Sequence, residues 1–283
     1  MKRIMAIVLC LLLIPCLAFA ELTVYFLDVG QGDSAIIVCD GEAMIVDGGK
    51  GEQNSSKIYT FLKEHEIKKL EYMVATHPDE DHVGGLAGAL NAVQVETILS
   101  PVQDWSTQAF QKFKEYARKQ NVPIVIPYPD DRYFYYLGGA TFRVLSCDTK
   151  GATPNEMSIC MRIDYGETSF LFTGDIEGYA LNQLISLKVP IEATVLKVGH
   201  HGSEKSNPDD LLRLVNPQYA IISCGKNQYG HPAEITLKLL KNHDIELYRT
   251  DLQGMITCVS DGKTIDIKPE HEAQGDIFSA TKE

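Results

Sequence analysis

The decapeptide THPDEDHVGG, residues 76–85, constrains this chain more than any other stretch of its sequence. It holds two histidines, three carboxylates and two glycines directly after an apolar run. In extended backbone His77, Asp79 and Asp81 point the same way, because side chains alternate along a strand. A turn into a following helix would bring His82 into the same space. The motif therefore predicts converging polar groups at the end of a buried strand.

Two aspartates held this close repel each other unless a cation neutralises them, so a metal site would explain the motif. A solvated acidic loop with an aspartate at a helix N-cap is the alternative. The flanking His77 and His82, and the position after a strand, favour the metal site. Gly84 and Gly85 let the following helix approach closely, because they lack a Cβ atom.

The rest of the chain reads as short strands alternating with helices. Apolar runs bounded by glycine predict strands, and apolar residues at helical spacing predict helices. Strands in both halves, each followed by helices, favour an α/β fold with two sheets packed face to face and helices outside. The predicted strands are residues 22–29, 34–39, 42–49, 71–76, 140–147, 157–165, 168–174, 193–199, 219–224, 255–260 and 263–268. The predicted helices are residues 55–70, 83–93, 176–187, 208–215 and 233–244.

The first 20 residues have the layout of a secretory signal peptide: two basic residues, an apolar run and an alanine-containing site that ends at Ala20. Cleavage there predicts a secreted or extracytoplasmic protein associated with the cell surface. An uncleaved membrane anchor and a lipoprotein signal at Cys16 are the alternatives. Residues 21–268 are expected to form one domain, and residues 269–283 a polar C-terminal tail that frays.

Composition limits the partners and the redox chemistry. The chain has 26 Lys and Arg against 38 Asp and Glu, a formal net charge of −12 at pH 7. Nucleic-acid binding would therefore need a local basic patch. Cys10 and Cys16 fall in the predicted leader, which leaves five of the seven cysteines, widely spaced and without a CxxC pair. These predict buried free thiols with at most one disulfide, and they argue against a thiolate metal site.

Other chemistry-bearing residues follow three later strands. Asp175 ends a strand and begins a helix, where an N-cap is the alternative role. His200 and His201 lie together between glycines after another strand, an arrangement that packing seldom needs. His231 lies in a glycine-proline loop, where a surface turn is the alternative.

Taken in order, these motifs resemble the metallo-β-lactamase superfamily, in the branch that contains the extracytoplasmic hydrolase domain of ComEC-type DNA-uptake proteins. The resemblance rests on HPDEDH, GD and GHHGS, and on FLDVGQGDSAII, IVDGG, PNEMS and YGHP. It covers Leu22 to Lys268, without the many membrane-spanning segments of full-length ComEC. It implies a four-layer αββα sandwich with a two-metal site where the sheets meet at one edge.

The resemblance also implies metal ligands. His77 and Asp79 would bind one divalent ion. Asp81 and His82 would bind the other. Asp175 would bridge the two ions.

The histidine pair would supply the remaining ligation, with His201 favoured and His200 an alternative or a substrate contact. One departure concerns the further metal-binding histidine that the superfamily commonly has, since this chain has Asn155 in that region. Asn155 would instead hold a substrate oxygen or a water, with a capped turn as its alternative role. A ligand set of oxygen and imidazole without thiolate fits zinc or manganese.

Two such ions would lower the pKa of a shared water and stabilise charge on the attacked group. We therefore predict hydrolysis of a phosphodiester by the resulting hydroxide, with Asp81 or Asp79 orienting it. His200 or His231 would protonate the leaving oxygen or hold an anionic oxygen.

By resemblance, the favoured substrate is DNA or a nucleotide phosphodiester, which would make the protein a nuclease that acts in competence. No stable protein partner is evident. Polar side chains within the motifs are expected to contact the substrate, namely Asp33, Asn155, Ser158, Lys197 and Ser203. For Asp33, the alternative role is to stabilise a hairpin turn. A basic rim is expected from Lys197, Lys205, Arg213 and Lys226.

Three other functions are compatible with parts of this pattern. A cell-surface phosphoesterase acting on small or wall-linked phosphodiesters, such as phosphocholine esters, suits the acidic composition. A β-lactamase is disfavoured by the missing histidine and the DxDH variant. A non-enzymatic protein with a structural metal is disfavoured because structural sites are closed and four-coordinate.

Overall fold

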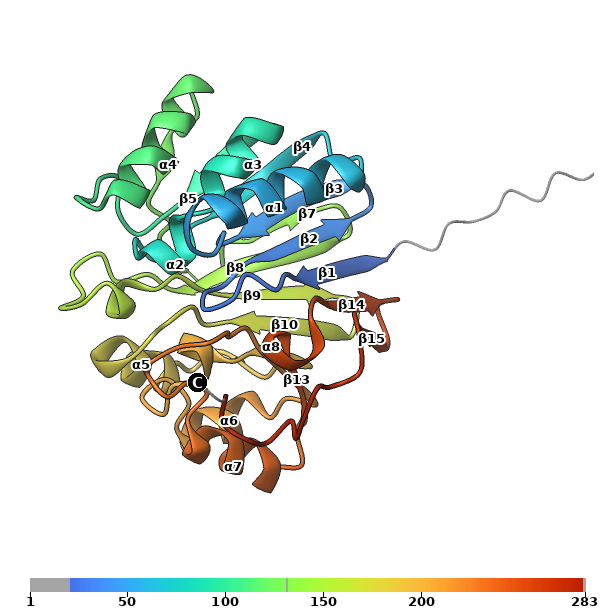
Figure 1. Ribbon diagram of the computed structural model, residues 1–283. Coiled ribbons are helices and arrows are strands. Elements are labelled where there is room, and N and C mark those ends of the chain that lie inside the picture. Colours follow the sequence, from blue (N-terminus) through green and yellow to red (C-terminus); the bar gives the residue numbers. More distant parts are fainter. Residues whose placement is uncertain (1–20, 131, 282–283) are drawn as a thin grey trace, which may run out of the picture.

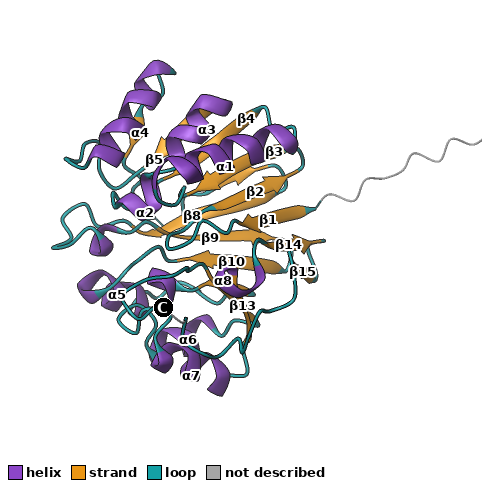
Figure 2. Ribbon diagram, in the orientation of Figure 1, coloured by secondary structure: helices purple, strands orange, loops and turns teal. Residues whose placement is uncertain are grey.

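Two sheets packed face to face, with helices on both outer faces, form the molecule (Figure 1 and Figure 2). The computed structural model describes residues 21–130 and 132–281, so the predicted signal peptide and anchor lie outside the described residues. This architecture confirms the predicted four-layer αββα sandwich.

The first sheet combines strands from the first half of the chain with the last two strands. Among the described residues its order is β15 (Ile265–Pro269), β14 (Ile256–Ser260), β1 (Leu22–Phe26), β2 (Ala35–Cys39), β3 (Glu42–Val46), β4 (Lys69–Val74), β5 (Gln94–Leu99) and β6 (Ile124–Val125). Strands β3 to β6 pair in parallel. The loops that follow β3 and β4 therefore leave the sheet at the same edge.

The second sheet comes from the second half of the chain. Its order, within the described part, is β13 (Glu246–Arg249), β12 (Tyr219–Ile222), β11 (Val195–Lys197), β10 (Thr168–Phe172), β9 (Cys160–Tyr165), β8 (Ala140–Ser146) and β7 (Tyr135–Leu137). Strands β10 to β13 are parallel, so the loops after β10, β11 and β12 also share one edge. Ligands commonly bind at such carboxyl ends of parallel strands.

Three buried apolar layers hold the sandwich together. The layer between the sheets includes Phe26 and Phe172, whose rings stack with centroids 5.7 Å apart. A second layer lies under helices α1 (Gly51–Glu64), α3 (Leu86–Ala92) and α4 (Gln108–Lys119) on the first sheet. A third lies under α5 (Gly178–Ile185), α6 (Asp209–Val215) and α7 (Glu234–Asn242) on the second sheet. The short helices are α2 (Glu80–Val83) and α8 (Thr250–Gln253), with 3-10 turns η1 (Asn155–Met157) and η2 (Gly199–Gly202).

The C-terminal tail packs against the second half of the molecule. The fully buried Arg249 donates hydrogen bonds to the carbonyl of Ile277 at 3.0 Å and to the hydroxyl of Thr281 at 2.9 Å. The guanidinium also pairs with Asp251 at 2.7 Å. The expectation that this tail frays is therefore wrong as far as Thr281, because a buried cation binds it.

The cysteines within the described chain are all free thiols, namely Cys39, Cys147, Cys160, Cys224 and Cys258. This confirms the expectation of unpaired, largely buried cysteines. Between residues 21 and 281, leaving out residue 131, no helix has both the length and the apolar character that crossing a bilayer requires.

Candidate metal centre

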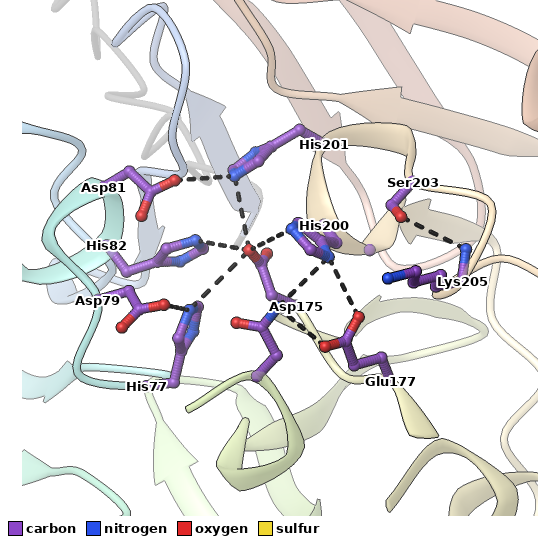
Figure 3. Close-up of polar contacts among 12 residues, drawn as sticks. His77, Asp79, Asp81, His82, Asp175, Glu177, His200, His201, Ser203 and Lys205 are labelled. Carbon is purple, nitrogen blue, oxygen red and sulfur yellow. Dashed lines mark hydrogen bonds and ion pairs between the residues drawn. The ribbon is translucent and has the colours of Figure 1, made fainter. Parts of the chain in front are cut away.

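Loops from both sheets bring the predicted ligands to one edge of the sandwich (Figure 3). The loop after β4 carries His77 and Asp79, and Asp79 is the N-cap of α2. That short helix, a single turn, carries Asp81 and His82. From the second sheet, Asp175 follows β10, and the histidine pair lies in η2 after β11.

The carboxylate of Asp175 lies at the centre of this cluster. Imidazole Nε2 atoms from both halves of the chain surround its Oδ2 atom. Their distances from it are 3.3 Å for His82, 3.6 Å for His201, 3.7 Å for His200 and 3.9 Å for His77. A buried carboxylate surrounded by imidazoles from both sheets could hold a cation together with them.

Two further aspartates lie beside imidazoles of this centre. Asp81 Oδ2 lies 3.3 Å from His201 Nε2, and Asp79 Oδ2 lies 3.8 Å from His77 Nε2. The ligand atoms of one group, made up of Asp81, His82, Asp175 and His201, all lie within 4.8 Å of one another. The structure thus brings together every residue predicted as a metal ligand, and it places His201 rather than His200 beside Asp81.

The unsatisfied polar atoms of the cluster show that these residues fit a metal. Among the described residues, Nε2 of His77, His82 and His201 and Oδ1 of Asp175 are buried without hydrogen-bond partners. Buried polar groups are nearly always paired in folded proteins, and a divalent cation would satisfy all of these lone pairs. Oxygen and imidazole donors without sulfur fit zinc or manganese.

Asp47 supports the cluster from behind, a role that the sequence interpretation missed. Its Oδ2 lies 2.8 Å from His82 Nδ1, and it accepts hydrogen bonds from the backbone and hydroxyl of Thr76 at 2.8 and 2.7 Å. A carboxylate on Nδ1 fixes the ring so that Nε2 faces the cation. The signal was present in IVDGG, where Asp47 directly follows the buried strand β3.

Electrostatics are strongly coupled across the cluster. Burial would lower the pKa of His201, but the carboxylates of Asp175 and Asp33 raise it to about 10. Burial and the neighbouring His82 lower the pKa of His77 to about 3. Burial would raise the pKa of Asp81, but a hydrogen bond with His201 holds it well below its usual range. Protons thus partly balance the carboxylates, and cation binding would displace them.

The backbone of η2 is held in an unusual conformation that aims both imidazoles at Asp175. His200 has φ 49° and ψ 48°, and His201 has φ 54° and ψ 26°. Left-handed conformations of residues other than glycine cost on the order of 1–3 kcal/mol each, and they cluster at functional sites.

A close backbone contact also positions α2 and α3. A Cβ atom on Gly85 would lie 2.0 Å from the carbonyl oxygen of Gly48. The predicted close approach at Gly85 is therefore confirmed, and it sets the loop after β3 against the start of α3.

A second polar group lies on the more open side of the cluster. His200 is 22% exposed, and its Nδ1 lies 3.5 Å from the amide nitrogen of Asn155 and 3.8 Å from Glu177. The His231 ring lies 5.0 Å from that of His200, centroid to centroid. Burial and the charges of His200 and His201 lower the pKa of His231 to about 4, so this imidazole is neutral at pH 7. Glu177 was missed by the sequence interpretation, since no motif singled it out.

Three predicted substrate contacts lie in the interior instead. The Lys197 ammonium is 4% exposed and pairs with Asp33 at 2.7 Å. Ser158 is fully buried, and its hydroxyl accepts a hydrogen bond from the backbone of Asp175 at 3.1 Å. The structure therefore corrects these positions: Lys197 and Asp33 lie behind His201, and Ser158 holds the Asp175 loop.

Ser203 and Lys205 occupy different environments in the turn that follows η2. Ser203 is buried, and its hydroxyl accepts a hydrogen bond from the backbone nitrogen of Lys205 at 3.3 Å. This contact stabilises the turn, and the substrate contact of Ser203 stays a prediction. The side chain of Lys205 is exposed, and its charge contributes to the lowered pKa of His231.

Residues 27–226 match the family model of the metallo-beta-lactamase superfamily. The chain belongs to this superfamily and is a metal-dependent hydrolase of it. ComE operon protein 3 of Bacillus subtilis is 32% identical to it over 87% of this chain and 34% of that protein. Recombination protein 2 of Haemophilus influenzae is 29% identical over 81% of this chain and 28% of that protein. Competence protein ComA of Neisseria gonorrhoeae is 28% identical over 84% and 32%.

These relatives confirm the resemblance to the ComEC branch. The chain spans only about a third of the length of each of them. Among solved structures, the metallo-beta-lactamase fold protein YhfI of Bacillus subtilis aligns with a TM-score of 0.59 at 12% identity. That alignment covers 85% of this chain and 100% of YhfI, and it confirms the fold.

Proposed function

We propose that this chain hydrolyses phosphodiester bonds with two divalent ions, which the residues around Asp175 would hold. The observation that carries the proposal is the convergence of imidazoles from both sheets on the Asp175 carboxylate at 3.3 to 3.9 Å. His77 and Asp79 would hold one ion. Asp81 would hold the other, together with His82 and His201. Zinc and manganese both suit these donors.

Bound divalent ions would lower the pKa of a water to near neutrality and stabilise charge on a phosphoryl group. Asp79 and Asp81 each place a carboxylate at the rim of the cluster, where it can accept a proton from the attacking water. His231 is neutral at pH 7, so it is suited to hold an anionic oxygen by a hydrogen bond rather than to donate a proton. The partly exposed His200 lies between His231 and Asp175, next to Asn155, which can orient the substrate.

DNA is the substrate we favour, because three relatives carry names that refer to competence, the ComE operon or recombination. Exposed lysines near the centre would contact phosphates and partly offset the net charge of −12. Lys205 and Lys226 are exposed on loops that follow β11 and β12. Arg213 is already paired with Asp209 on α6 at 2.7 Å, so it contributes less to such a rim. We also propose secretion, because the first 20 residues have the layout of a signal peptide.

Metal-dependent cleavage of DNA tests this proposal. Single- and double-stranded oligonucleotides would be incubated with the protein in manganese or zinc, next to an Asp175→Asn variant. The control variant is Asp210→Asn, which changes an exposed carboxylate on α6. We expect cleavage by the wild type and the control, and loss of at least about 100-fold in the Asp175 variant, since even supporting groups of metal ligands are worth 10–100-fold. An inactive wild type that contains metal would refute the nuclease proposal.

A cell-surface phosphoesterase for small or wall-linked phosphodiesters is the second candidate, and the net charge of −12 favours it. Hydrolysis of a bis-aryl phosphate without DNA cleavage would support this function. Nitrocefin hydrolysis would instead indicate a β-lactamase. A purely structural metal is disfavoured, because the partly exposed His200 lies beside Asp175 and structural sites are closed.

A further inference from the structure

Lys197 and Asp33 form an ion pair in the interior directly behind the candidate centre. The two residues are 4% and 5% exposed, and the ammonium lies 2.7 Å from Asp33 Oδ2. The same ammonium donates a hydrogen bond to the carbonyl of Val198 at 3.0 Å. Removing two charges from water costs several kcal/mol per ion, and a buried pair is weak evidence for stability alone. The position of this pair therefore calls for a specific explanation.

The second oxygen of Asp33 faces the ligand His201. Asp33 Oδ1 lies 3.2 Å from His201 Nδ1, and Nδ1 donates a hydrogen bond to the carbonyl of Ser223 at 3.0 Å. Within the described chain, Asp33 Oδ1 is buried and accepts no hydrogen bond, so it faces the imidazole as an ion-pair partner. A carboxylate and a carbonyl beside Nδ1 keep the proton on that nitrogen. The Nε2 lone pair, which faces Asp81 and Asp175, is then available to a cation.

Asp33 also joins the two sheets at this point. Its backbone nitrogen donates to the carbonyl of Asp81 at 3.1 Å, and its carbonyl accepts from Gly49 at 2.7 Å. Lys197 is the last residue of β11, in the other sheet. His201 needs such support, because a φ of 54° is strained for a residue other than glycine.

We infer that Lys197 and Asp33 are a positioning pair, which holds His201 in the orientation and tautomer that bind the ion beside Asp81. The carboxylate fixes the ring, and the ammonium holds the carboxylate in place at 2.7 Å. This inference rests on the proposed two-ion function, but it concerns ion affinity rather than hydrolysis. Both side chains are buried and paired with each other, which separates this role from that of a phosphate-binding lysine.

The test compares cobalt uptake by the whole protein and by the double variant Asp33→Asn/Lys197→Met. Changing both residues leaves no unpaired buried charge, so the double variant is expected to fold, as its thermal melting curve would show. The matched control is Arg162→Met/Asp164→Asn, which removes another ion pair, 2.8 Å long, on β9. Visible absorption of bound cobalt reports each ion's environment and stoichiometry, and competition with zinc gives affinities.

We expect one ion of the double variant to bind about 10–100-fold more weakly, with an altered spectrum, and the other to keep its wild-type affinity. The control should match the wild type for both ions. Wild-type affinities for both ions in the folded double variant would overturn the positioning role. An equal loss of ion affinity in the control would also overturn it, because the loss would then reflect a general effect on stability. A wild type that takes up no cobalt would instead refute the proposed function itself.

Discussion

Asp47 shows how one carboxylate outside the ligand set can control the centre. Asp47 is only 1% exposed, and its Oδ2 lies 2.8 Å from His82 Nδ1. Thr76 donates hydrogen bonds to both carboxylate oxygens. The ring of His82 can then present only Nε2 to Asp175. The orienting effect of Asp47 on His82 can be tested by replacing the carboxylate with a neutral side chain of the same shape.

We predict that Asp47→Asn weakens ion binding about 10–100-fold, because an amide cannot fix the tautomer of His82 as a carboxylate does. Metal content after dialysis against graded chelator would measure this. Asp266→Asn, at an exposed position on β15, is the matched control and should retain wild-type metal content. Unchanged affinity in the Asp47 variant would mean that Thr76 and packing alone orient the ring.

The candidate ligands were accessible to sequence interpretation, but their neighbours were not. His77, Asp79, Asp81 and His82 occur within one decapeptide, and their spacing alone indicates convergence. Lys197 looked like a phosphate contact because sequence does not reveal burial. Its ammonium is enclosed only when β11 pairs beside β10 and the Asp33 loop closes over it, a contact between residues 164 positions apart.

At the scale of elements, two glycines separate the helices α2 and α3 beside the candidate metal centre. The pattern of residues 83–93 predicted one continuous helix, which is wrong: α2 ends at Val83, and α3 begins at Leu86. Gly84 and Gly85 lie between them, because the loop after β3 occupies the space beside Gly85. This long-range contact overrides the local helical pattern.

We predict that Gly85→Ala destabilises the protein by about 1–3 kcal/mol, the usual effect of forcing extra atoms into a packed contact. The added Cβ would meet the Gly48 carbonyl at 2.0 Å, so α3 must shift. Denaturant unfolding would show a lower midpoint with an unchanged slope. Asn91→Ala, at an exposed position of the same helix, should leave the midpoint unchanged or raise it slightly. Equal stability of the two variants would show that the contact between Gly85 and the Gly48 carbonyl has room for a methyl group.

Most other elements followed their local patterns, with ends shifted by a few residues. The predicted helix at residues 55–70 begins earlier, at Gly51, and ends at Glu64. The region between residues 94 and 139 received no assignment, although it contains α4 and strands β5 to β7. Strands β6 and β7 have two and three residues, too few to show an alternating pattern.

For the whole molecule, the buried thiols provide a test of the packing. Burial raises the pKa of Cys147 to about 12, and the other described thiols are buried. Since only the thiolate reacts, and each pKa lies above pH 8, we predict almost no labelling by a thiol reagent in the native state at that pH. In denaturant without reductant, protein beginning at residue 21 should expose all five thiols. Fewer thiols in denaturant would reveal a disulfide.

Ion binding should stabilise the molecule as a whole, because the ligands come from both halves of the sandwich. His77, Asp81 and His82 belong to loops of the first sheet, whereas Asp175 and His201 belong to loops of the second. A bound ion would therefore cross-link the sheets and neutralise carboxylates that repel one another. An ion at a thousand times its dissociation constant contributes about 4 kcal/mol to the free energy of unfolding.

In a chain of this size, about 4 kcal/mol corresponds to a rise in Tm of roughly 8–16 °C. We expect zinc or manganese to produce this rise in chelator-treated protein, and renewed chelation to reverse it. The Asp175→Asn variant should respond much less, because it lacks the carboxylate shared by the two sets of imidazoles. A Tm that is the same with ions, with chelator and in the variant would show that the edge is held by protein contacts alone, and that the histidines and aspartates converge there without binding a metal.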